Sequence, residues 1–239
     1  WERAEEGRFY PLGSHFRAGK DGVLALAFLV LLLGVGSREA GVDALRCPSS
    51  VYMGLMALSA LLFCCSGILG LLEGMNQLTL WRSNPSSHIL TYPLALAACS
   101  VLAVIAGGAT LMLGRSAHTG KEAPFLSILV CFPPLTALVW VFSSHLAHGT
   151  DPVLMGYGLP LAAAVALLLA HYQLAAFFHR RPAPRRFAFA ALAGIALGVT
   201  SLADALPPFQ TALTGALVLS ALANVWAMLG SPPSSPRTH

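Results

Sequence analysis

Long apolar stretches separated by short polar connections dominate this sequence of 239 residues. A helix rises 1.5 Å per residue, so about 20 apolar residues cross the roughly 30 Å of hydrocarbon in a bilayer. Six of the stretches contain 17 to 26 residues, and the first contains 15. The pattern predicts an all-α fold, a polytopic bundle of about seven transmembrane helices. The seven apolar blocks are 22–36, 50–72, 89–114, 124–145, 153–178, 187–203 and 207–229.

The composition supports a membrane environment. Only 10% of the residues are charged and 56% are hydrophobic, whereas soluble domains carry about 25% charged residues. The net charge of +4 comes from basic residues placed between the apolar blocks. Topology therefore explains that charge better than an anionic partner does.

We expect one transmembrane domain, at 22–229, with a polar or interfacial segment at 1–21 and a flexible polar tail at 230–239. The first apolar block is short, reaching roughly 22 Å as a helix. It either crosses a locally thinned bilayer or is re-entrant or interfacial, which leaves six spans. The chain begins at Trp1 without a signal-peptide pattern, so we expect a fragment or a processed product.

The connection "HRRPAPRR" holds the densest cluster of positive charge in the chain. With seven spans, the connections on its side carry nine Lys and Arg residues and those on the other side carry five. Short basic loops stay in the cytoplasm, so this connection and the C-terminus are predicted to be cytoplasmic. The N-terminus opposes this assignment, because it carries four of the five basic residues on the outer side. The predicted topology anchors, which also suit anionic headgroups, are Arg180, Arg181, Arg185 and Arg186.

Two features bear on helix packing. Pro133 and Pro134 fall mid-span in the fourth block, where missing N–H groups predict a helix break. This is either a broken helix lining a cavity or a packing kink repaired by neighbours. Small residues at intervals of four predict close helix contacts, namely Ala95, Cys99, Ala103 and Gly107, then Ala190, Gly194 and Gly198, and then Gly70 and Gly74.

Ionisable groups near the outer ends of three spans are candidates for a polar vestibule. They would attract a cation or a basic solute, or they are ordinary helix-end residues that meet water. His145 and His148 share a helical face near Asp151, but three such groups at a fraying end do not predict a metal site. The five candidates are Glu73, His145, His148, Asp151 and Asp204.

Polar residues also lie deeper in the spans. His171 either bonds to a neighbouring helix or relays protons. Ser220 and Asn224, at an interval of four, form a seam that either holds helices together or lines a solute path. If the second helix continues to Trp81, Glu73 is not at a terminus and contacts its neighbours.

These features favour a small-solute permease or the substrate-binding membrane subunit of a transport system, with the solute unknown. The alternative is a non-transporting sensor, assembly or structural partner, joined to other membrane subunits or to a second copy. No nucleophile–base pair, Walker, HExxH or GxSxG pattern is present, so neither an enzyme nor a cofactor is predicted. No folded basic module accompanies the arginines, so nucleic-acid binding is not predicted.

The run "FPPLTALVW…DPVLMGYGLP…HYQLAAFFHRRPAPRR…SLADA" in the C-terminal half resembles uncharacterised bacterial polytopic integral membrane proteins. The resemblance rests on a loose pattern without a catalytic motif. It implies a location in the bacterial cytoplasmic membrane and no particular activity.

Overall fold

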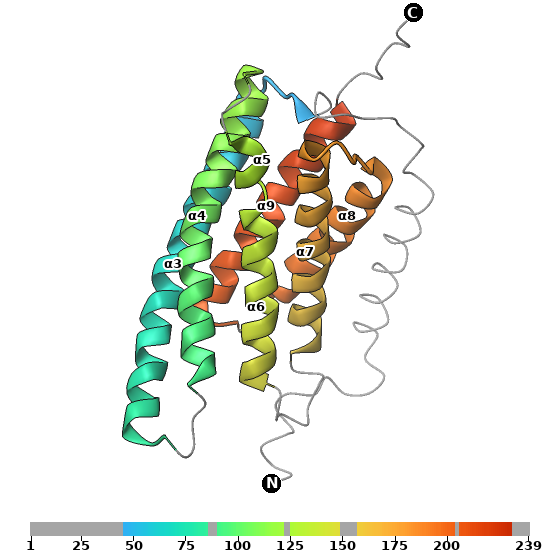
Figure 1. Cartoon of the computed structure of the whole chain (residues 1–239). Helices are drawn as coiled ribbons and strands as arrows, with labels where there is room; N and C mark the ends of the chain where they lie inside the picture. Colours follow the sequence, from blue (N-terminus) through green and yellow to red (C-terminus); the bar gives the residue numbers. More distant parts are fainter. Residues whose placement is uncertain (1–44, 86–89, 122–124, 149–156, 204–205, 231–239) are drawn as a thin grey trace, which may run out of the picture. The chain divides into compact units, whose positions relative to one another are not determined.

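The structure, a computed structural model, describes residues 45–85, 90–121, 125–148, 157–203 and 206–230. These residues form helices and no strand, which confirms the all-α part of the predicted fold class (Figure 1). All of the described helices belong to the unit Ser37–His239, and the other unit, Trp1–Gly36, lies outside the described residues. The helices are α3 (Ser50–Ser83), α4 (Thr91–Thr119), α5 (Leu126–Leu129), α6 (Phe132–His148), α7 (Gly158–Phe178), α8 (Pro184–Ser201) and α9 (Pro208–Gly230).

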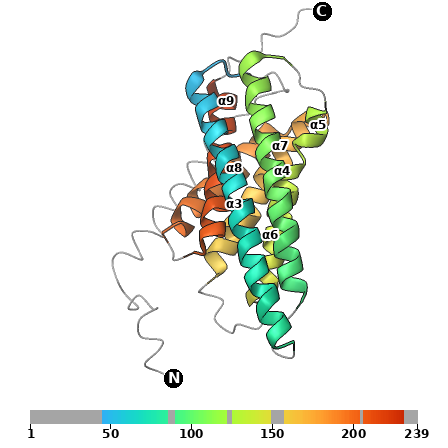
Figure 2. The same ribbon diagram turned by 90° about the vertical axis from the view of Figure 1, so that its left-hand side faces the viewer.

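The six longer helices pack in a closed ring. Each contacts the next in the order α3, α4, α6, α7, α8 and α9, and α9 returns to contact α3. Figures 1 and 2 show the helices side by side, with consecutive members running in opposite directions. The last described helix therefore lies beside the first.

Five helices are long and apolar enough to span a membrane. They are Ser50–Ser83, Thr91–Thr119, Leu126–His148, Gly158–Phe178 and Pro208–Gly230, where the third range takes α5 and α6 together as one span. The helix α3 has 34 residues and is about 51 Å long, so it extends beyond the hydrocarbon. The helix continues past residue 72 and includes Trp81, so Glu73 lies within the helix and not at its terminus.

The predicted count of seven spans is not reached among the described residues. The block at 187–203 does form α8, but α8 is not one of the five. Its 18 residues include Arg185 and Arg186, which lower its mean hydropathy. The block at 22–36 lies outside the described residues.

Large apolar side chains cover the outside of the ring. Leu61 and Ile68 on α3 are 59% and 60% exposed, and Leu138 on α6 is 51% exposed. The interior contains many alanines, such as Ala106 and Ala163, which are fully buried. Hydrocarbon tails solvate such a surface and water does not, so lipid is the solvent of this bundle.

The predicted small-residue contacts are present. A β-carbon added to Gly107 would lie 2.9 Å from the Ala60 carbonyl oxygen, and one added to Gly70 would lie 2.6 Å from the Ser100 hydroxyl. Gly194 packs against Leu167 in the same way. Gly198 packs against Val218, Gly74 lies near Pro93, and Ala95, Cys99, Ala103 and Ala190 are buried. Because these glycines have no side chain, α3 can approach α4 closely, and α8 can approach both α7 and α9.

The helix break predicted near Pro133 and Pro134 exists, but it lies near the start of the span and not at its middle. The helix stops after Leu129 and resumes at Phe132. Both prolines thus occupy the first turn of α6, where a missing N–H removes no intrahelical bond. The break is therefore the start of α6, near one end of the bundle.

Candidate functional site

The predicted vestibule is only partly within the described residues, since Asp151 and Asp204 lie outside them. Glu73 is half-buried, and its carboxylate accepts a hydrogen bond from Gln77 on its own helix at 2.8 Å. His145 lies one helical turn before the end of α6 and is exposed. The vestibule therefore stays a prediction.

His148 is held by its neighbours at the end of α6. Its Nδ1 donates to the Ser144 carbonyl at 3.0 Å, and its ring stacks on Tyr157 at a centroid distance of 4.9 Å. No group of three His, Cys, Asp or Glu side chains suited to a metal occurs within the described ranges. The contacts of His148 connect α6 to the start of α7.

Four hydrogen bonds join α3 to α9, and three of them have their donor on α3. The hydroxyl of Tyr52 donates to the Asn224 side-chain oxygen at 3.3 Å. The Ser59 hydroxyl donates to the Ala216 carbonyl at 2.7 Å, and the Ser66 hydroxyl donates to the Phe209 carbonyl at 2.9 Å. The three donors recur every seven residues, so they lie on one face of α3. We call these three bonds the α3–α9 seam.

The side chain of Asn224 is occupied by hydrogen bonds within the bundle. Besides accepting from Tyr52, its amide nitrogen donates to the Ser220 carbonyl at 2.7 Å and contacts the Met56 sulfur at 3.8 Å. Asn224 is fully buried, and the Ser220 side chain is 1% exposed. The predicted polar stripe of α9 thus takes part in helix packing.

Glu73 and Asn224 cannot line one compact pocket. Asn224 lies at the level of Tyr52, and Glu73 follows Tyr52 on α3 by 21 residues. At 1.5 Å per residue the separation along the axis is about 31 Å, close to the thickness of the hydrocarbon.

His171 is a buried histidine with one unused nitrogen. Its Nδ1 lies 2.8 Å from the Leu167 carbonyl oxygen, which can only accept, so Nδ1 carries the proton. In a neutral ring Nε2 is then an acceptor, and it has no partner within the described part of the chain. On the adjacent helix α6, the Trp140 Nε1 donor is likewise buried without a described partner.

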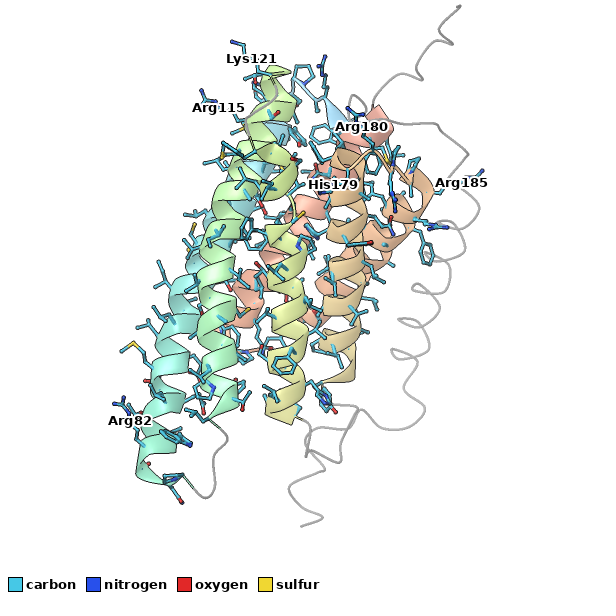
Figure 3. All side chains as sticks on the ribbon, in the orientation of Figure 1. Arg82, Arg115, Lys121, His179, Arg180 and Arg185 are labelled. Atoms are coloured by element: carbon cyan, nitrogen blue, oxygen red, sulfur yellow. The ribbon has the colours of Figure 1, made fainter. Side chains whose placement is uncertain are left out.

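The basic residues gather at one end of the bundle, opposite Arg82 (Figure 3). The same end carries Arg115 and Lys121 at the end of α4, and the four arginines that follow α7 and begin α8. Arg46 belongs there too, because the neighbouring Cys47 N–H donates to the Ala117 carbonyl. Of the eight Lys and Arg residues that the structure describes, seven are at this end.

The turn after α7 has an unusual residue at its centre. The Arg181 N–H donates to the Ala176 carbonyl at 3.0 Å, which closes a Schellman motif. The intervening Arg180 adopts a left-handed conformation with φ of 56°. Glycine normally occupies this position, as Gly120 does after α4 with φ of 69°.

A second contact at this end was not predicted from the sequence. The Cys131 sulfur, at the break between α5 and α6, lies 3.5 Å from Nε2 of His179, at the end of α7. Both residues are exposed. They are 48 residues apart in the chain, so no local motif indicates the pairing.

Comparisons with known protein families, with curated proteins and with solved structures find no match to this chain.

Proposed function

We propose that this chain is a non-transporting membrane protein that serves as a structural or assembly partner. The observation that supports the proposal is the α3–α9 seam, in which interior polar side chains are occupied by helix packing. Asn224 and Glu73 cannot share one solute-binding pocket, because they lie about 31 Å apart along the direction of the α3 axis. A packed ring of this kind presents lipid-facing surfaces to other spans and holds its own interior closed.

The test is a solute screen on the full chain in nanodiscs. A ligand that binds the folded state raises its thermal stability, so a permease is stabilised by its solute. We expect no member of a library of ions, amino acids, sugars and amines to stabilise the wild type. Stabilisation that Glu73→Gln or Asp204→Asn abolishes would overturn the proposal.

A small-solute permease is the second candidate, supported by the unused Nε2 of His171. A buried acceptor without a partner commonly marks a water or ligand. His171→Leu removes this acceptor while roughly keeping the side-chain volume. If a proteoliposome takes up a labelled solute and His171→Leu stops the uptake with the protein still folded, the permease is the correct function.

We also propose that the chain spans the bacterial cytoplasmic membrane seven times with its arginine-rich end in the cytoplasm. The distribution of seven basic residues against Arg82 supports this orientation. In a cysteine-free background, Ala183→Cys should react only from the cytoplasmic side. Tyr10→Cys should react only from the outside, and labelling of both from one side would leave an even number of crossings between them.

A further inference from the structure

We propose that residues 179–186, which run from the end of α7 through the first turn of α8 and are called the α7–α8 connection here, bind the phosphate-bearing headgroup of an anionic phospholipid. This proposal goes beyond the membrane partner function and does not depend on it. Topology anchoring requires only positive charge near the membrane. A headgroup site requires in addition backbone donors beside that charge and an apolar surface next to it for the acyl chains.

The positive charge of this connection is not neutralised by the described residues. Its four arginines are exposed, and no hydrogen bond or ion pair joins their guanidinium groups to any other part of the chain that the structure describes. Glu73, the one acidic residue among those described, lies in the second half of α3, toward the end of the bundle that carries Arg82. In the sequence the nearest carboxylates, Asp151 and Asp204, are more than a dozen residues away on either side.

The start of α8 adds backbone donors to these arginines. Pro184 is the first helical residue, and no side chain caps the helix from Ala183. The N–H groups of Arg185 and Arg186 therefore lie in the first turn, where backbone donors lack intrahelical partners. The helix dipole repels cations at this position, and an anion would be stabilised by both the N–H groups and the guanidinium groups.

Arg180 is kept at a conformational cost. A non-glycine residue in the left-handed region is strained, and such strain is concentrated at functional sites. The same chain uses Gly120 for the equivalent turn after α4. The presence of arginine here indicates that its guanidinium group has a use that glycine cannot supply.

The connection is held against the apolar bundle by two buried aromatic side chains. Phe177 and Phe187 flank it, are 2% and 1% exposed, and meet edge to face at 5.8 Å. Both adjoining helices continue directly into the apolar bundle, and Tyr172, one turn or more below on α7, is 61% exposed. A lipid phosphate at the arginines would place its acyl chains along this apolar surface. A soluble anion would gain no such contact, which is why a lipid is the favoured occupant.

The experiment uses the full chain in nanodiscs, which expose both leaflets and so remove orientation as a variable. Thermal stability is measured in phosphatidylcholine alone and with increasing phosphatidylglycerol. We expect saturable stabilisation of the wild type by phosphatidylglycerol. The double variant Arg185→Gln with Arg186→Gln should bind phosphatidylglycerol about thirtyfold more weakly. Each charge lost near the membrane surface weakens binding roughly fivefold, and two are lost.

Two variants separate a site from a general surface potential. Arg115→Gln with Lys121→Gln removes equal charge at the same end of the bundle and should leave the affinity unchanged. Arg180→Gly keeps the left-handed turn, so it should fold normally in phosphatidylcholine yet bind phosphatidylglycerol about fivefold more weakly.

Three outcomes would overturn the proposal. The first is an absence of stabilisation of the wild type by phosphatidylglycerol. The second is an equal loss of affinity in both double variants, which would indicate a diffuse potential. The third is equal stabilisation by inorganic phosphate in phosphatidylcholine nanodiscs, which would assign the site to a soluble anion.

Discussion

The hydroxyl of Tyr52 donates a hydrogen bond to the side-chain oxygen of Asn224 across 172 residues of sequence. The bond joins the first turn of α3 to the last two turns of α9, and both side chains are fully buried. Together with the bonds of Ser59 and Ser66, it closes the ring of helices. In lipid, where apolar contact between helices gains little, such bonds help to specify which helices are neighbours.

Tyr52→Phe should destabilise the bundle by about 0.6 kcal/mol, and by no more than about 1.7 kcal/mol. The change removes only the donor and leaves the Asn224 oxygen without it. Unfolding in mixed detergent micelles measures the difference. Tyr172→Phe is the matched control, because Tyr172 is 61% exposed, and it should have no effect. Equal effects of the two changes would contradict the role of the bond.

Ser59→Ala and Ser66→Ala should each lower the free energy of unfolding by a similar amount, roughly 0.6 kcal/mol. The two hydroxyls bond different carbonyls, two helical turns apart, so the double variant should show nearly additive loss. Ser83→Ala is the control, since its hydroxyl is exposed and bonds only the Leu80 carbonyl of its own helix. A double variant as stable as the wild type would rule out the α3–α9 seam as a source of stability.

Gly107→Ala and Gly108→Ala should have opposite effects although they are adjacent. A β-carbon at Gly107 meets the Ala60 carbonyl oxygen at 2.9 Å and would push α4 away from α3. A β-carbon at Gly108 meets nothing within 4 Å, so alanine there should stabilise the helix by up to about 1 kcal/mol. Thermal denaturation of the two variants provides the comparison. Stabilisation by both changes would show that the α3–α4 contact is looser than described.

Cys131 should react with a water-soluble maleimide faster than Cys99. Cys131 is exposed and meets His179 at the basic end of the bundle, whereas Cys99 is 3% exposed and bonds the Thr136 carbonyl. Mass spectrometry of peptides after brief labelling of the folded protein measures both rates. Similar rates before denaturation would mean that α4 does not pack against α6 as described.

Much of the fold could be predicted because the bilayer imposes a length on every apolar helix. The block at 207–229 differs by one residue at each end from α9 (Pro208–Gly230). The block at 50–72 ends eleven residues before α3 does, because apolar residues such as Leu78, Leu80 and Trp81 continue the helix past Glu73. Hydropathy marks where a helix enters lipid, and helix-breaking residues decide where it ends.

The sixth apolar block differs from its helix at the N-terminal end. It forms a helix as predicted, but the helix begins at Pro184 and takes in Arg185 and Arg186. The sequence places proline at a favourable helix start, so the arginines join the helix and do not remain in the loop. The number of spans therefore depends on local helix initiation as well as on apolar length.

Side-chain partners could not be predicted, because they depend on which helices are neighbours. The polar stripe containing Asn224 is visible in the sequence, and helix packing was one of its two interpretations. Its partner Tyr52 lies in the block at 50–72. Apart from the seven-residue spacing to Ser59, nothing in that block indicates that Tyr52 forms a hydrogen bond. The contact of Cys131 with His179 likewise requires the pairing of α6 with α7.

The α3–α9 seam also sets an order of events during synthesis. The partners of Tyr52, Ser59 and Ser66 are made 143 to 172 residues later. At about 5–20 residues per second, the donors of α3 wait roughly 7–34 seconds in the membrane before their partners in α9 are made. A ribosome that stops before α9 leaves those hydroxyl groups in lipid without their final acceptors, so such a product should be recognised and degraded by membrane quality control.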